Sequence, residues 1–220
     1  MFSIIQAAGW PIWPLLICSV LALAVIIERS FQLQRHKVAP KGLLESHLHA
    51  WGQRPPAQPI GLDLVALKAS SSLGAILALA QQLLVQHRKA PAFAKSTLDA
   101  KAWEQEVRFE MEGLGQQLTV DLNRYLSTLS TIASVAPLLG LLGTVLGMID
   151  IFASQSASAN QPLELSLGIS MALYNTAMGL VVAIPSLVAW RVFRARVDQY
   201  VGELEWASES AVQALIKLNG

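Results

Sequence analysis

The sequence has little charge and almost no cysteine. Charged residues make up 14% of the 220 residues, whereas hydrophobic residues make up 53%. This balance is too apolar for an ordinary soluble domain and too charged for a chain that lies in a membrane throughout. The one cysteine, Cys18, excludes an internal disulfide, and we expect it to pack as a buried side chain. The net charge of +1 gives no reason to expect nucleic-acid binding.

The usual patterns of catalytic and metal sites are also absent. No G-x-x-x-x-G-K-[ST] motif occurs, so ATP is not the evident energy source. His47 and His49 are two positions apart and would diverge on a helix, so we expect the histidines to be solvated rather than metal ligands. We predict no enzyme activity, no cofactor and no bound metal.

Three stretches contain no charged residue, namely 9–27, 129–149 and 167–190. A membrane-spanning helix needs roughly 20 such residues. The first stretch has no preceding Lys or Arg and no small-x-small cleavage site after it, which argues against a signal peptide. We therefore predict an all-α integral membrane protein with three transmembrane helices.

The positive charges indicate how these helices are oriented. All 16 lysines and arginines lie either between Arg29 and Arg124 or after Trp190. By the positive-inside rule, the N-terminus and the loop after Asp150 lie outside, and the insert and the tail are cytoplasmic. The predicted parts are the N-terminus with the first transmembrane helix (1–32), a cytoplasmic helical insert (33–128), the second transmembrane helix (129–152), an outer loop (153–166), the third transmembrane helix (167–190) and a cytoplasmic helical tail (191–220).

The insert and the tail both read as helical. We expect helices over 40–51 and 62–88, with breaks over 52–61 and at Ala90-Pro91. Apolar residues from Trp103 to Leu129 recur every three or four positions, which predicts one continuous helix leading into the second span. A similar stripe from Phe193 to Leu215 extends the third span to about residue 217. These stripes pack within one chain or between copies, and we predict a homo-oligomer, since so thin an insert buries little alone.

The second and third spans carry small residues on one face. Ala133, Ala136, Gly140, Gly143 and Gly147 form a ridge on the second span, and Gly179 lies on a small face of the third. Such ridges let helix backbones approach closely in lipid, and close packing alone is a sufficient role for the glycines. Pro137 should kink the second span or free a carbonyl near Ala133.

Four of the polar side chains in these spans are candidate ion-pathway residues. They are Ser134, Thr144, Asn175 and Thr176. A threonine hydroxyl can instead bond the carbonyl four residues back in its own helix. Asn175 is costly to leave unpaired in lipid, so it should face protein or water. Proton relays in membranes use Asp, Glu or His, and the spans have none. If an ion crosses here, another subunit must supply the titrating carboxylate.

These spans closely resemble the signature helices of the ExbB/TolQ/MotA proton-channel family. The resemblance rests on APLLGLLGTVLGMIDIF (136–152) and GISMALYNTAMGLVVAIPSLVAW (168–190), together with GWPIWPLLICSVLALAVIIERSFQL (9–33). Three spans rather than four make the chain most like ExbB or TolQ. The resemblance implies a bacterial inner-membrane protein with a periplasmic N-terminus and a cytoplasmic C-terminus.

The resemblance also implies a ring, typically a pentamer, around an ExbD- or TolR-like partner whose single span carries an aspartate. Residues matching Thr144 and Thr176 would line the proton route, and the motion would drive a TonB- or TolA-like protein. Met171 occupies the position where many relatives have a glutamate, which sharpens dependence on the partner. The alternatives are a TolQ-like role in envelope integrity and a passive membrane scaffold. The choice between proton and sodium stays open.

Overall fold

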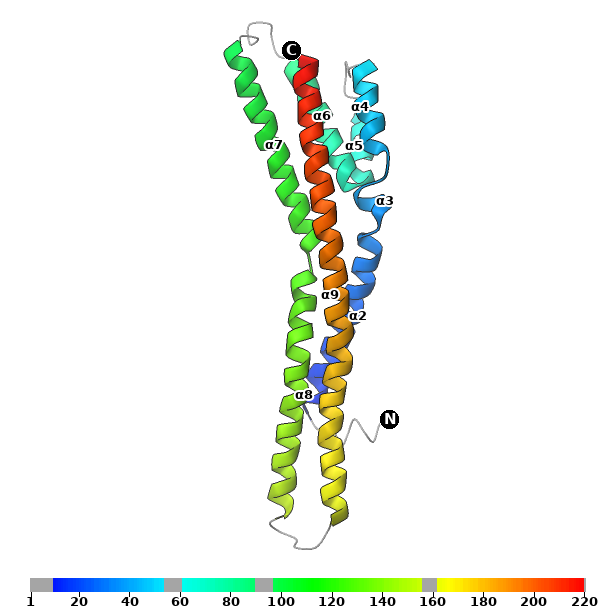
Figure 1. The fold of residues 1–220 in the computed structure, drawn as a ribbon, viewed down its shortest axis with the longest axis vertical. Coiled ribbons are helices and arrows are strands. Elements are labelled where there is room, and N and C mark those ends of the chain that lie inside the picture. The colour runs from blue at the N-terminus through cyan, green and yellow to red at the C-terminus, as the bar shows by residue number, and fades with distance from the viewer. Residues whose placement is uncertain (1–9, 54–60, 90–96, 156–161, 220) are drawn as a thin grey trace. The chain divides into compact units, whose positions relative to one another are not determined.

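The computed structural model describes residues 10–53, 61–89, 97–155 and 162–219. Every regular element in those ranges is an α-helix, which confirms the all-α prediction for the described part of the chain (Figure 1). The helices are α2 (Ile12–Gln32), α3 (Arg35–Val38), α4 (Leu43–Gln53), α5 (Gly61–Ser70), α6 (Ser72–Lys89), α7 (Thr97–Asn123), α8 (Leu126–Gln155) and α9 (Pro162–Asn219).

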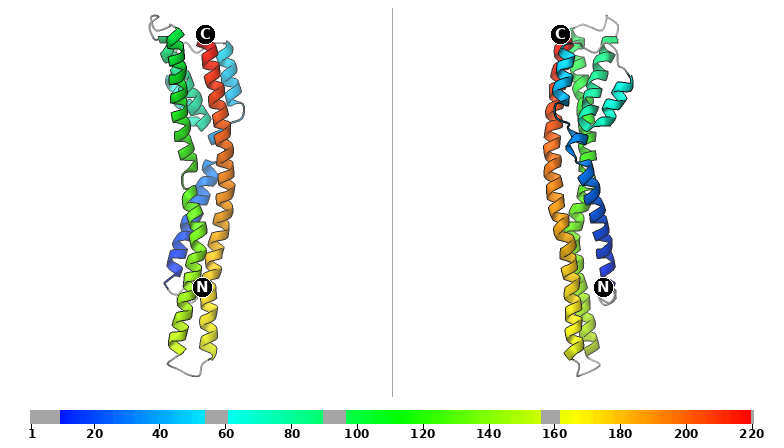
Figure 2. Two further views of the ribbon diagram at one scale, coloured as in Figure 1. Left: turned by 60° about the vertical axis from the view of Figure 1, so that its left-hand side comes forward. Right: turned by 90° about the vertical axis from the view of Figure 1, so that its right-hand side faces the viewer.

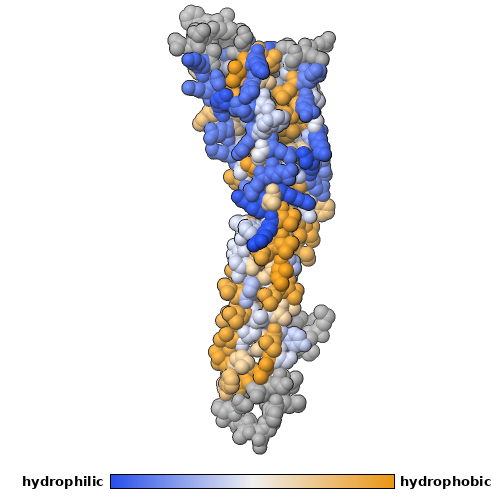
Figure 3. Space-filling model, in the orientation of Figure 1, coloured by the Kyte–Doolittle hydropathy of each residue, from blue (hydrophilic) through white to orange (hydrophobic). Residues whose placement is uncertain are grey.

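Three helical stretches are long and apolar enough to cross a membrane, as predicted. They are Ile12–Gln32, Lys101–Ala153 and Gly168–Leu218. Many of the exposed side chains in these stretches are large and apolar, and Leu138 and Val181 are each more than 60% exposed. Figure 3 shows hydrophobic residues over these spans and hydrophilic residues gathered on the insert. A membrane interior is the medium in which such a surface is stable.

The chain divides into two compact units. The apolar unit comprises Met1–Ser30 and Tyr125–Arg194, and the insert unit comprises Phe31–Arg124 and Ala195–Gly220. Cys18 belongs to the apolar unit, where it is only half-buried, so the expectation of a buried thiol was wrong. It lies on α2 one turn after the buried Leu15 and one turn before the buried Ala22, on the same face, yet it is only partly covered.

In the insert unit α6 lies at the centre and packs against α3, α4, α5 and α7 (Figure 2). Its Leu77, Ala80 and Leu84 are fully buried. On the tail of α9, the predicted apolar stripe is buried from Val197 to Leu215. Burial of these faces is the main source of stability for helices in such a bundle.

The predicted helix over 62–88 is interrupted at Ser71, where α5 ends and α6 begins. The Ser71 hydroxyl accepts a hydrogen bond from the Gly74 N–H at 3.0 Å, which caps α6. A Cβ atom at Gly74 would overlap the Leu67 carbonyl oxygen, so only glycine permits this close approach of α5. The predicted helix at 40–51 is shifted to α4, and α3 was not predicted. The predicted breaks lie mostly outside the described residues, and so does the middle of the outer loop.

The continuous helix expected from Trp103 to Leu129 was also wrong, because α7 ends at Asn123 and α8 begins at Leu126. Between them Tyr125 has φ +60°, a conformation that costs a non-glycine residue about 1 kcal/mol or more. The guanidinium of Arg29 lies 5.3 Å from the centre of the Tyr125 ring, within the apolar unit. This cation–π contact offsets part of the backbone cost. Local periodicity alone could not reveal a contact with a residue so distant in sequence.

We expect Gly113→Ala to stabilise the insert unit. A Cβ atom at Gly113 would meet nothing within 4 Å, and glycine inside a helix costs about 0.5–1 kcal/mol relative to alanine. Thermal unfolding in detergent, followed by circular dichroism, should show a rise in the midpoint. Gly42→Ala is the matched control: Gly42 also has open space but has φ +78°, so alanine there should lower the midpoint. An unchanged or lowered midpoint for Gly113→Ala would contradict the argument.

Candidate functional site

The candidate site lies where α8 and α9 approach each other in the apolar unit. A Cβ atom on Gly140 would lie 2.8 Å from the Asn175 carbonyl oxygen and 3.0 Å from the Thr176 Cα. A Cβ atom on Gly179 would lie 2.7 Å from the Ala136 carbonyl oxygen. Any side chain at either glycine therefore meets backbone of the facing helix. The two helices touch backbone to backbone, as small-residue ridges allow in lipid.

Two further contacts extend this interface toward the loop that joins α8 to α9. A Cβ atom on Gly143 would lie within 2.9 Å of the Asn175 side chain, and one on Gly147 would lie 3.3 Å from the Ala172 Cβ. Asn175 is only 3% exposed. Its amide therefore lies inside the helix pair, in the space that the absent side chain of Gly143 leaves. Burial of an amide in a span requires polar partners nearby, which marks this level of the interface as polar.

Thr176 connects the two helices through a hydrogen bond. Its hydroxyl donates to the Gly140 carbonyl oxygen at 3.2 Å, across the interface. The alternative in which this hydroxyl bonds its own helix is therefore not what the structure shows. In a regular helix the Gly140 carbonyl also accepts the N–H of Thr144, four residues on. The Gly140 carbonyl oxygen thus accepts hydrogen bonds from the hydroxyl of Thr176 and from the backbone N–H of Thr144.

Thr144 and Ser134 behave differently from Thr176. The Thr144 hydroxyl donates to the Leu141 carbonyl at 2.7 Å, and the Ser134 hydroxyl donates to the Ser130 and Thr131 carbonyls at 3.1 and 2.9 Å. Both are bonds within α8, the arrangement that is common for hydroxyls in helices. The structure therefore brings Thr176 and Asn175 to the glycine interface, and leaves Thr144 and Ser134 bonded to their own helix.

Each of the two long apolar helices contains a proline. Pro137 lies inside α8 as expected, and Pro185 lies inside α9, where sequence reasoning overlooked it. A proline removes one intrahelical hydrogen bond and frees the carbonyl four residues earlier. Beside Pro185, the buried Ser186 hydroxyl donates to the Val182 carbonyl at 2.7 Å. The proline was readable from the sequence, whereas the burial of Ser186 was not.

A buried cation was also missed. Arg29 is 1% exposed, although sequence reasoning treated it only as a topological charge at a helix end. Two carboxylates of the apolar unit lie elsewhere: Glu28 is half-buried on α2 and Asp150 is exposed near the C-terminal end of α8. The α8–α9 interface thus has a hydroxyl, an amide and backbone carbonyls but no titratable group among its described residues. No group of three or more His, Cys, Asp or Glu side chains that could hold a metal occurs in the described part of the chain.

Comparison with known proteins places this interface in a family. The model of the MotA/TolQ/ExbB proton channel family matches residues 77–206, which include α8 and most of α9. The chain belongs to this family. Biopolymer transport protein exbB1 of Vibrio cholerae is 31% identical over 91% of this chain and 82% of its own length. A putative ExbB-like biopolymer transport protein of Synechocystis is 32% identical over 91% of both chains.

A second branch of the MotA/TolQ/ExbB family is similar over a shorter stretch. The Tol-Pal system protein TolQ of Pseudomonas aeruginosa is 34% identical over 42% of this chain and 43% of its own length. The family and the three apolar helices make this chain a membrane protein of a proton-channel family rather than a member of a known enzyme class.

Proposed function

We propose that this protein is the ring subunit of a proton-driven motor in the bacterial inner membrane. Copies of the chain, typically five, would surround the single spans of an ExbD-like partner. The motor would convert the proton motive force into mechanical work on a TonB-like protein for outer-membrane import. The N-terminus would be periplasmic and the C-terminus cytoplasmic, as the distribution of Lys and Arg supports.

One observation carries this proposal. The α8–α9 interface is polar at Asn175 and Thr176 yet has no carboxylate among its described residues. A proton relay at this depth needs a titratable group, so the partner must bring it. A membrane aspartate on the partner span would meet the hydroxyls of Thr176 and Thr144, with Asn175 and Ser134 on the same route. Gly140, Gly143, Gly147, Gly179 and Pro137 would hold the helices in place.

The energy available per ion sets how the motor must operate. Moving one charge through 100 mV yields about 2.3 kcal/mol. Useful mechanical work would therefore take several ions, which a ring with repeated identical sites can deliver in sequence. An ExbB-like role is favoured over a TolQ-like role in envelope integrity because relatives named ExbB include two that match 91% of the chain, whereas the TolQ relative matches 42%.

We expect proton flux only when the partner is present. The purified chain in liposomes under an imposed potential, followed with an entrapped pH dye, should leak no faster than empty liposomes. Addition of an ExbD-like partner should raise the flux at least tenfold, and Asp→Asn in the partner span should abolish the increase. A sodium gradient in place of the pH gradient identifies the ion. If the chain alone conducts protons at a motor-like rate, the hypothesis that the partner supplies the titrating carboxylate is wrong.

A passive scaffold is the competing function. It would hold a partner through the small-residue helices without using an ion gradient. An uncoupler separates the two functions: it should abolish import driven by a motor, and it should leave the activity of a scaffold unchanged.

A further inference from the structure

The insert unit contains a groove between α7 and the tail of α9. Its volume is about 820 Å³. Its buried floor is apolar and consists of Ile76, Met111, Leu204 and Val212. Gly115 lies on its wall, where a Cβ atom would meet nothing within 4 Å. The groove therefore offers an apolar floor and room for a helix to approach closely.

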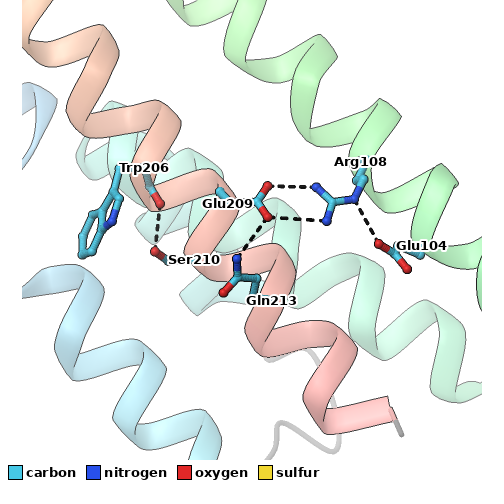
Figure 4. A network of polar contacts seen from close by, with 6 residues as sticks. All are labelled: Glu104, Arg108, Trp206, Glu209, Ser210 and Gln213. Atoms are coloured by element: carbon cyan, nitrogen blue, oxygen red, sulfur yellow. Dashed lines mark hydrogen bonds and ion pairs between the residues drawn. The ribbon is translucent and has the colours of Figure 1, made fainter.

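An ion pair joins the two walls of the groove. Arg108 on α7 donates to Glu209 on α9 at 2.8 Å and to Glu104 at 3.1 Å, as Figure 4 shows. Two hydrogen bonds hold the pKa of Glu209 below its ordinary value. The one from Arg108 has the larger effect, and the one from Gln213 the smaller. The Arg108 guanidinium is thus already occupied by two carboxylates.

Two other carboxylates line the groove without an ion-pair partner among the described residues. They are Glu112 and Glu205. Val120, also on the lining, is 69% exposed. The groove thus combines apolar surface with uncompensated negative charge, which fits an apolar helix that carries a cation.

Helix α5 presents such a surface. Val65 is 70% exposed, and the exposed Lys68 follows one helical turn later. Lys68 forms no ion pair with any residue that the structure describes. The right-hand view of Figure 2 shows α5 and the tail of α9 on opposite sides of the insert unit. One copy can therefore offer α5 and the groove to two different neighbours.

We propose that α5 of one copy docks into the α7–α9 groove of the next copy. Val65 packs against Val120, and Lys68 meets the carboxylates of Glu112 and Glu205. Two different surfaces meet, so the contact is head-to-tail and closes into a ring when the rotation between copies is suitable. This inference rests on the self-assembly in the proposed function, and it names the cytoplasmic surfaces that join neighbours.

Cross-linking in membranes tests the contact without ion flow. In a Cys18→Ser background, one tagged chain carries Val65→Cys and a second, differently tagged chain carries Val120→Cys. Oxidation should give a mixed dimer at least tenfold stronger than when Val65→Cys is paired with Gln199→Cys, an exposed position of α9 outside the groove lining. A chain carrying both Val65→Cys and Val120→Cys should give a ladder. No mixed dimer, or an equal yield with the control, would overturn the proposal.

Charge reversal supplies a second, independent measurement. Lys68→Glu should shift the native mass distribution toward smaller assemblies, and Glu205→Lys in the same chain should restore it. Assembly that is insensitive to Lys68→Glu, or a double variant no better than the single, would argue against the contact. Neither measurement requires the partner or a proton gradient. If ion-driven function is absent but the cross-link forms, the proposed motor function is wrong and the proposed contact between copies still holds.

Discussion

Gly179→Ala should destabilise the apolar unit. The new Cβ atom would lie 2.7 Å from the Ala136 carbonyl oxygen and 3.1 Å from the Gly140 Cα, and both are backbone atoms that cannot rotate away. Overpacking of this kind costs about 1–3 kcal/mol. Separation of the helices would also lengthen the 3.2 Å hydrogen bond from Thr176 to Gly140. Unfolding of the purified protein in detergent, titrated with a denaturing surfactant, measures the loss.

The control for this substitution is Gly202→Ala on the same helix. A Cβ atom at Gly202 meets nothing within 4 Å, so alanine there should be neutral or slightly stabilising. Gly147→Ala should fall between them, because its neighbour at 3.3 Å is the Ala172 side chain rather than backbone. Equal losses at Gly179 and Gly202 would show that the close backbone approach does not hold the unit together.

The small-residue ridge of α8 illustrates how far a sequence can be read in a membrane helix. Helical periodicity alone placed Ala133, Ala136 and Gly140 on one face, and all three are buried. In lipid, residue size and spacing decide which faces can meet, so the ridge is encoded locally. The N-cap at Ser71 is also encoded by neighbouring residues. The spacing of Ser71 three positions before Gly74 would have predicted it.

Other features depend on contacts between distant parts of the chain. The hydroxyl of Thr176 on α9 donates a hydrogen bond to α8, whereas the hydroxyl of Thr144 donates within its own helix. Nothing in the local sequence distinguishes the two threonines. The difference arises only because Gly140 has no side chain. Helix α9 can therefore come close enough for the Thr176 hydroxyl to reach the Gly140 carbonyl oxygen. The break at Tyr125 has the same character, since its contact with Arg29 brings together residues from the two separate segments of the apolar unit. Periodicity predicts a helix there, and a tertiary contact overrides it.

Thr176→Val should abolish ion-driven function while the assembly still forms. Valine has nearly the shape of threonine, so the packing against Gly140 is kept, and the loss of one hydrogen bond costs about 0.5–1.5 kcal/mol. Proton flux with the partner present should nevertheless fall at least tenfold, because a hydroxyl is removed from the proposed route. Thr176→Ser, which restores the donor, should recover most of the flux. Native mass spectrometry of each variant checks that the oligomer is intact.

Thr144→Val extends this test to the hydroxyl that bonds its own helix, and the motor again predicts loss of flux with assembly preserved. Thr131→Val is the matched control: Thr131 also lies on α8, is exposed, and donates to the Ser127 carbonyl at 2.9 Å, but it is not on the proposed route. Flux lost in the Thr176 and Thr144 variants but kept in the Thr131 variant would separate a role in conduction from a general need for helix hydroxyls. Full flux with valine at both Thr144 and Thr176 would instead favour the passive scaffold, because close packing of glycines would then be all that the interface contributes.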